Sequence, residues 1–102
     1  MTRLRVSPEA EKELGEAAAW YEERRGGLGI DLVALVDKAF EAIVAAPPSF
    51  PLWRSDRDYR KMVLKRFPYV VFFRYDANDD EVVVIAVAHS RRRPGYWVDR
   101  VP

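Results

Sequence analysis

The chain has 102 residues, of which 49% are hydrophobic and 13% aromatic, so it can build one hydrophobic core and lacks the composition of a disordered protein. It contains no cysteine and one histidine, which excludes disulfides, thiolate metal sites and histidine metal clusters. We expect neither a metal nor a cofactor. The net charge of +1 argues against a general nucleic-acid binder.

The sequence gives no sign of a secreted or membrane protein. Residues 1–14 lack the apolar core of a signal peptide, and the longest apolar run, Val82–Ala88, is far shorter than a membrane-spanning helix. We therefore expect a cytoplasmic protein that contacts no membrane, in which residues 1–102 form a single domain.

The N-terminal residues predict a short strand followed by a helix. Arg3–Val6 alternates as a strand does. Ser7 then offers a capping hydroxyl, Pro8 suits a first helical turn, and Glu9 places an acid near the positive end of the helix dipole. Apolar residues recur at helical spacing as far as residue 21, and Arg24–Gly29 ends the helix with a glycine available for a left-handed cap.

A second amphipathic helix follows at once. Val33, Val36 and Phe40 lie at helical spacing, and Pro47 and Pro48 stop the helix because proline has no amide donor. The short link between two helices with apolar stripes implies an antiparallel helical hairpin.

Three strand-like segments complete the chain: Tyr59–Phe67, Tyr69–Asp76 and Glu81–His89. Turn residues at Pro68 and at 77–80 separate them, so the three strands form hairpins. The element order is β-α-α-β-β-β. The predicted fold class is α+β, with a small, mainly antiparallel four-stranded sheet packed on an N-terminal helical hairpin.

Basic residues are concentrated in two blocks. Residues 54–66 hold six Lys or Arg against two acids, and residues 89–102 hold four against one. Two predicted strands separate the blocks in sequence, and strands that pair as hairpins can bring them together. We therefore predict a basic patch as a hypothesis for the structure to test.

The residues that could carry chemistry are basic and aromatic. The sequence has no glycine-rich phosphate loop, Ser-His-Asp spacing or metal motif. RNA cleavage remains open, because the ribose 2′-hydroxyl is an internal nucleophile and a site need only hold the phosphate and help proton transfer. His89 is the candidate for proton transfer and Tyr96 for base stacking. Candidates for phosphate binding are Arg60, Lys61, Lys65, Arg66, Arg74, Arg91, Arg92 and Arg93.

Each of these residues also has a purely structural interpretation. Lysines and arginines on a half-exposed strand are usually solvated, and a histidine at a strand end is often a hydrogen-bonded structural residue. Tyr96 and Trp97 are suited to packing on the edge of the sheet. Arg74 lies inside an apolar strand, so it must pair with Asp76, reach the far face of the sheet, or serve a site.

Several stretches, taken in order, resemble the toxins of the RelE/ParE superfamily, the growth-arresting half of type II toxin–antitoxin modules. The resemblance spans nearly the whole chain and rests on "SPEAEKEL", "WYEERRGGLG", "IVAAPPSFP", "YRKMVLKRFPYVVFFRYD" and "IAVAHSRRRPGYW". The fold that the resemblance implies, a small sheet on a helical hairpin, agrees with the fold predicted from periodicity.

The resemblance implies one of two activities. ParE-like toxins block DNA gyrase by binding, and RelE-like toxins cut mRNA on the ribosome. The long helical hairpin and the "His-x-x-Arg-x-Pro-x-Tyr-Trp" ending resemble the ParE branch, and a near-neutral charge is unusual for docking on ribosomal RNA. For gyrase binding the candidates are Arg60, Lys65, Arg66, Arg91, Arg92, Arg93, Tyr96 and Trp97. For a RelE-like nuclease the catalytic candidates are His89, Tyr96 and Arg74. A third possibility is a non-toxic relative that only binds its antitoxin.

The resemblance also implies a cognate antitoxin as partner, and hence a hetero-oligomer. The groove between the helices and the edge of the sheet are surfaces that such a partner can use. We predict that the antitoxin contacts Trp20, Trp53 or both, because exposed tryptophans are good anchors. The alternative is that both tryptophans are core residues.

Overall fold

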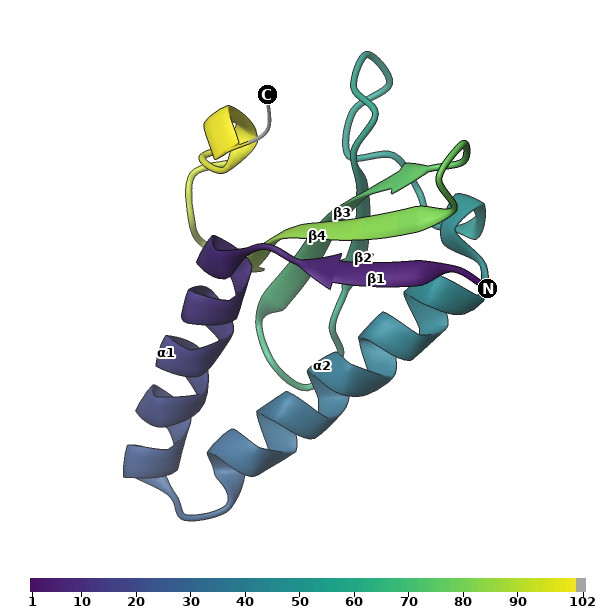
Figure 1. Cartoon of the computed structure of the whole chain (residues 1–102). Coiled ribbons are helices and arrows are strands. Elements are labelled where there is room, and N and C mark those ends of the chain that lie inside the picture. Colours follow the sequence, from purple (N-terminus) through teal and green to yellow (C-terminus); the bar gives the residue numbers. More distant parts are fainter. Residues whose placement is uncertain (101–102) are drawn as a thin grey trace.

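The computed structural model describes residues 1–100 and confirms the predicted element order. The elements are β1 (Arg3–Val6), α1 (Pro8–Arg24), α2 (Leu28–Ala45), η1 (Pro47–Ser49), β2 (Arg60–Val63), β3 (Tyr69–Asp76), β4 (Glu81–His89) and η2 (Val98–Arg100). Both helices lie on one side of the sheet and the C-terminal turn η2 lies on the other (Figure 1). None of the helices within residues 1–100 is long and apolar enough to span a membrane.

The four strands lie in the order β1-β4-β3-β2. β3 is antiparallel to both β2 and β4, as the hairpins require, whereas β1 runs parallel to β4. The sheet is therefore mixed. Periodicity could not show this, because β1 reaches the sheet through the helical hairpin and no turn fixes its direction.

The first helix begins as predicted and ends differently. Ser7 Oγ accepts from the Ala10 amide at 3.1 Å, which caps α1. The expected glycine cap at its C-terminus is wrong, because Arg25 is extended there and its amide donates to the Tyr21 carbonyl at 3.0 Å. Gly27 (φ 91°) instead precedes α2, where Glu22 accepts from the Gly27 and Gly29 amides.

β2 is shorter than the predicted strand 59–67. Arg66 has a left-handed backbone (φ 72°), and the Phe67 amide donates to the Lys65 carbonyl at 2.8 Å. Residues 64–68 therefore form a tight turn, and the strand ends at Val63. A left-handed conformation is uncommon for a residue with a β-carbon, and no feature of the apolar pattern indicated it.

The sheet buries apolar residues on both faces. On the helix side, Leu32, Val36 and Ile43 of α2 pack with Phe73 and Val84 of the sheet. No α-helix covers the far face within the described residues. A second cluster closes it instead, formed by Phe72, Ile85, Ala86, Ala88 and Trp97 with Trp53, Tyr59 and Tyr96 against it. The C-terminal segment is therefore part of the core, and the same segment carries three of the candidate arginines.

Candidate functional site

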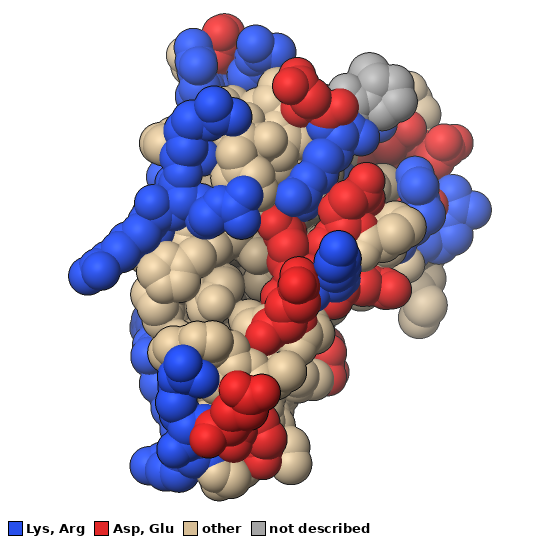
Figure 2. Space-filling model, turned by 90° about the vertical axis from the view of Figure 1, so that its left-hand side faces the viewer, with Lys and Arg blue, Asp and Glu red and all other residues tan. Residues whose placement is uncertain are grey.

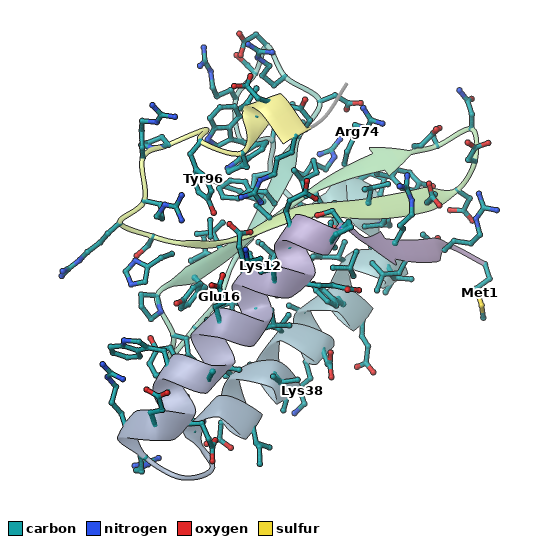
Figure 3. All side chains as sticks on the ribbon, turned by 60° about the vertical axis from the view of Figure 1, so that its left-hand side comes forward. Met1, Lys12, Glu16, Lys38, Arg74 and Tyr96 are labelled. Carbon is teal, nitrogen blue, oxygen red and sulfur yellow. The ribbon has the colours of Figure 1, made fainter. Side chains whose placement is uncertain are left out.

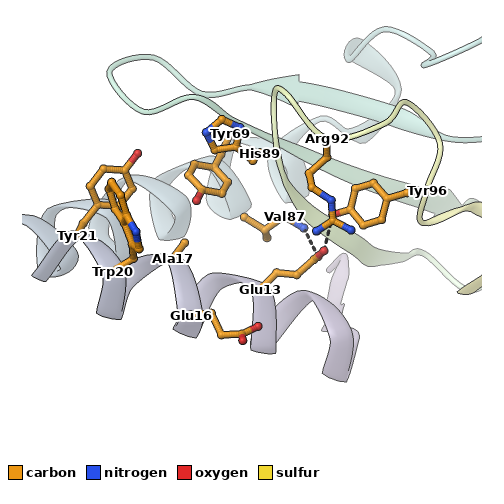
Figure 4. Close-up of a pocket in the computed structure, with 10 residues that line it drawn as sticks. All are labelled: Glu13, Glu16, Ala17, Trp20, Tyr21, Tyr69, Val87, His89, Arg92 and Tyr96. Carbon is orange, nitrogen blue, oxygen red and sulfur yellow. Dashed lines mark hydrogen bonds between the residues drawn. The ribbon is translucent and has the colours of Figure 1, made fainter. Parts of the chain in front are cut away.

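A groove of about 410 Å³ separates α1 from the C-terminal half of β4 (Figure 4). One wall is α1 and the other is the end of β4 with the segment that follows it. The groove contains two of the predicted catalytic residues, His89 and Tyr96, and one predicted anchor, Trp20. Its lining is Glu13, Glu16, Ala17, Trp20, Tyr21, Tyr69, Val87, His89, Arg92 and Tyr96.

The groove exists because β1 stops at Val6 while β4 continues to His89. Beyond the end of β1, side chains take the place of the missing strand. Ser7 Oγ and Arg100 donate to the Ile85 carbonyl, both at 3.2 Å, and Glu13 accepts from the Val87 amide at 3.0 Å. Backbone groups at this edge are thus satisfied without another strand.

Glu13 is the centre of this arrangement. Arg100 donates to both of its oxygens, at 2.9 and 3.0 Å, and the Tyr96 hydroxyl donates to Oε2. The side chains of Glu13 and Arg100 are only 15% and 21% exposed. Burial raises the pKa of Glu13, but the hydrogen bonds from Arg100, Tyr96 and Val87 outweigh it and hold the pKa below its ordinary value.

The same network determines the state of Tyr96. Burial, together with the hydrogen bond to the Glu13 carboxylate, raises the pKa of Tyr96 to about 12. Its hydroxyl is therefore protonated near neutral pH and committed to Glu13. The Arg92 guanidinium stacks on the Tyr96 ring at 3.9 Å from its centroid, so the tyrosine also supports a basic side chain.

Because the pKa of Glu13 is lowered in the folded state, the ionised carboxylate adds to the free energy of unfolding at pH values above its unfolded-state pKa. This contribution is lost as pH falls through the folded-state pKa. We expect the stability difference between the wild type and Glu13→Gln to be largest near about pH 6 and to shrink toward about pH 3. Urea unfolding of both proteins across that range measures it. A difference that does not change with pH would contradict a lowered pKa for Glu13.

His89 lies at the end of β4 and faces Tyr69, with 5.2 Å between the ring centroids. Its Nδ1 accepts from the Arg91 amide at 3.1 Å, and its carbonyl accepts from the Arg92 amide at 3.0 Å. His89 therefore helps to shape the turn that presents the arginines, and its Nε2 is the nitrogen left for other contacts.

The two basic blocks of the sequence meet in part. The turn after β2 lies beside the segment after β4, because the Ser90 amide donates to the Pro68 carbonyl at 2.8 Å. We call the exposed basic residues of these two segments the basic end; they are Lys65, Arg66, Arg91, Arg92 and Arg93. Figure 2, which views the molecule from the side of α1, shows lysine and arginine side chains along its left-hand margin and at its top, and acidic side chains running through its centre.

Within the basic end, Arg66 forms an ion pair with Asp31 at 3.0 Å. Both side chains are about half exposed, at 50% and 44%, so such a pair is worth at most about 1 kcal/mol. This is no more than the cost of placing a residue with a β-carbon in the left-handed region, about 1–2 kcal/mol. The ion pair with Asp31 alone therefore does not offset the free-energy cost of the left-handed backbone at Arg66.

Arg60 and Arg74 do not join the basic end. Arg60 donates to the Phe50 carbonyl at 2.6 Å and ties down the loop before β2. Arg74 does not pair with Asp76; it reaches the far face of the sheet, where it lines a separate hollow with Arg5 and Arg100. Figure 3 shows Arg74 and Tyr96 on either side of the C-terminal turn, so the three catalytic candidates are not assembled in one place.

The three tryptophans have different environments. Trp97 is 1% exposed and packs 4.5 Å from Phe72 between ring centroids, so it is a core residue and offers no surface to a partner. Trp53 is half-buried and lies 4.9 Å from Trp97. Trp20 is 50% exposed, with the Arg24 guanidinium 3.5 Å from its ring centroid, and it alone has the exposure of an anchor.

The sequence interpretation missed Glu13 and Arg100. One signal for Glu13 was present, since it lies on the stripe of α1 that carries the buried Ala10 and Ala17. An acid among buried alanines needs a partner. The identity of that partner could not be predicted, because Tyr96 and Arg100 are 83 and 87 residues away.

A small four-stranded sheet packed on a helical hairpin agrees with the fold that the resemblance to toxins of the RelE/ParE class implies. The family described as "ParE toxin of type II toxin-antitoxin system, parDE" matches residues 4–94. The chain therefore belongs to the ParE toxin family. None of the curated protein sequences is significantly similar to it.

Solved structures of similar fold include both branches of the superfamily. A chain of the chromosomal ParDE system from P. aeruginosa superposes with a TM-score of 0.76 at 15% identity, covering 87% of this chain and 96% of that one. The intact E. coli RelBE complex gives 0.64 at 20% identity, with 90% and 100% coverage. The isolated E. coli RelE toxin gives 0.64 at 21% identity, covering both chains in full. At these identities the likeness shows the fold alone.

Proposed function

We propose that this ParE-family toxin arrests growth in the bacterial cytoplasm by binding and inhibiting DNA gyrase. The observation that carries the proposal is the state of Tyr96, whose hydroxyl donates to Glu13 and whose pKa is raised to about 12. A phenol in this state is a poor proton donor or acceptor at neutral pH. The groove is therefore better suited to binding than to catalysis.

The dispersal of the other candidates also favours binding. Arg74 lies in a different hollow from His89, and His89 Nδ1 is used by the backbone of Arg91. Phosphate cleavage needs charge stabilisation and proton transfer at one point. The basic end, by contrast, is an exposed surface on a rigid scaffold. The proposed gyrase contacts are the residues of the basic end, Lys65, Arg66, Arg91, Arg92 and Arg93, together with Tyr96 beneath Arg92. We do not propose Arg60 and Trp97 as contacts, because their side chains are engaged within the fold.

We also propose an antitoxin partner that docks on the helical hairpin. The groove between α1 and α2 has a volume of about 700 Å³, and Ile30 on its rim is 70% exposed. An apolar groove between helices suits an amphipathic helix. Trp20 is the proposed anchor for the segment of the antitoxin that continues toward the basic end. Trp53 is less suited to be an anchor, because it is half-buried against Trp97.

A ribosome-dependent mRNA endoribonuclease is the second candidate, favoured by the presence of His89, Tyr96 and Arg92 in one groove. Inducing the toxin alone in bacterial cells, with pulse-labelling of DNA and protein synthesis in the same culture, separates the two. Gyrase inhibition predicts that DNA synthesis stops first. If protein synthesis stops first, the ribonuclease replaces it. If neither stops although folded protein is present, this chain only binds its antitoxin.

Single substitutions in the basic end give a second test. For a binding inhibitor, we expect Lys65→Gln, Arg91→Gln and Arg93→Gln each to weaken inhibition of purified gyrase by about three- to tenfold. His89→Ala should have an effect of similar size. Lys38→Gln, on the exposed face of α2, is the matched control and should leave inhibition unchanged. A nuclease would instead lose about 100-fold or more of its activity on removal of its proton-transfer group.

A further inference from the structure

We propose that Glu13 is the positioning residue of the toxin's target-binding surface. In this view, a carboxylate near the N-terminus holds the C-terminal Arg91–Tyr96 segment in the geometry that the target recognises. The inference rests on the proposed function in one respect, that the basic end contacts a target. It adds a residue from the other end of the chain, which touches no target itself.

The first step is that the Glu13 carboxylate has a fixed location. Glu13 lies in the second turn of α1, and one of its oxygens accepts from the Val87 amide of β4 at 3.0 Å. It is thus held between a helix and a strand that belong to the same core. A carboxylate that is fixed both by its helix and by a hydrogen bond to the sheet can position the groups that bind to it.

The second step is that this fixed carboxylate holds Tyr96 and Arg100. The Tyr96 hydroxyl and both terminal nitrogens of Arg100 donate to it. Figure 4 shows the Glu13 side chain between the Val87 amide and the Tyr96 ring. Two points of the C-terminal segment, four residues apart, are therefore fixed to α1.

The third step links Tyr96 to the arginines. The Arg92 guanidinium lies 3.9 Å from the centroid of the Tyr96 ring, and the Tyr96 amide donates to the Arg93 carbonyl at 3.2 Å. The orientation of the ring therefore determines where Arg92 points, and the backbone bond keeps Arg93 beside it. Glu13 acts on the arginines through Tyr96.

A merely structural role for Glu13 would look different. Trp97 already anchors the backbone of this segment, because its ring is buried against Phe72 on the far face of the sheet. The Tyr96 hydroxyl is not needed for that anchoring. Its bond to Glu13 instead fixes the ring that supports Arg92, so loss of the hydroxyl should loosen the arginines while the fold remains.

The test compares three substitutions in the full-length toxin. Glu13→Gln keeps the shape of the side chain and removes its charge, and Tyr96→Phe removes only the hydroxyl. Glu11→Gln is the matched control, since Glu11 lies on the same helix, is exposed, and has no hydrogen-bonded side-chain partner within residues 1–100. Melting temperatures identify any variant that fails to fold.

Two spectroscopic measurements report on positioning alone. The Cζ resonance of Tyr96, assigned by its absence in Tyr96→Phe, should shift in Glu13→Gln and stay in place in Glu11→Gln. Amide hydrogen exchange at Arg92 and Tyr96, whose amides are bonded within the segment, should become at least about tenfold faster in Glu13→Gln and Tyr96→Phe. An unshifted resonance with unchanged exchange overturns the proposal.

Inhibition of gyrase supercoiling then measures the consequence for binding. We expect Glu13→Gln and Tyr96→Phe to weaken inhibition by about tenfold at a temperature where both are folded, with Glu11→Gln unchanged. Loosened arginines with undiminished inhibition overturn the proposal. If the wild type itself does not inhibit gyrase, the proposed function fails, and the spectroscopy together with growth arrest in cells decides the role of Glu13.

Discussion

Replacement of Trp97 by alanine is expected to destabilise the protein by about 3–5 kcal/mol, a large part of the stability of a domain of this size. The indole is 1% exposed and lies against Phe72, Trp53 and Tyr59, with ring centroids 4.5, 4.9 and 5.1 Å away. Its removal leaves a cavity that this aromatic cluster fills poorly. No α-helix covers this face within the described residues, and Trp97 is the most deeply buried of the large side chains that close it, so its loss removes the centre of the cluster.

Chemical denaturation of Trp97→Ala beside Trp20→Ala measures this effect. Both variants lose an indole, but Trp20 is 50% exposed, so we expect it to cost less than about 1 kcal/mol. A similar small loss for Trp97→Ala would contradict the core position assigned to it. Loss of antitoxin binding by Trp20→Ala, with its stability kept, would in turn identify Trp20 as the anchor.

The burial of Trp97 connects the proposed target-binding surface to the hydrophobic core. The residues just before it carry the basic end, so the arginines are attached to the core of the far face at Trp97 and to α1 at Glu13. A surface held at two points loses little conformational entropy on binding. Attachment at two points is therefore consistent with the target-binding role proposed for the few exposed arginines of the basic end.

The sequence predicted the strands and helices well where local chemistry determines them. β3 and β4 have the predicted bounds, since each is a largely apolar run between turn residues, and Ser7 caps α1 as expected. The end of β2 could not be predicted, because the turn depends on the left-handed Arg66. Nor could the parallel pairing of β1, which is a property of the tertiary fold.

From the sequence, the candidate site could be predicted only as two basic segments. The turn after β2 and the segment after β4 meet because β3 pairs with both neighbouring strands, and the sequence implied those pairings. Arg74 could not be placed from sequence, since three environments were open to it. The Glu13 network was not predictable either, because it joins α1 to residues at the other end of the chain.

Gly29→Ala is expected to destabilise the protein by about 2–3 kcal/mol, because the helices of the hairpin touch at this position. A β-carbon on Gly29 would lie 2.3 Å from the carbonyl oxygen of Ala18 and 3.0 Å from Glu22 Oε1. The carbonyl belongs to the backbone of α1 and cannot rotate away, so α1 and α2 must separate. Since Glu22 also caps the start of α2, the shift disturbs those hydrogen bonds as well.

Gly15→Ala is the matched control, because the substitution is identical and also falls inside a helix. Its β-carbon would meet nothing within 4 Å, so alanine should stabilise α1 by about 0.5–1 kcal/mol. Opposite signs for the two variants in urea unfolding would confirm the close approach at Gly29. Gly29 also lines the groove proposed for the antitoxin, so Gly29→Ala should weaken antitoxin binding and Gly15→Ala should not. If Gly29→Ala were neutral in both assays, the helices would lie farther apart than this structure has them.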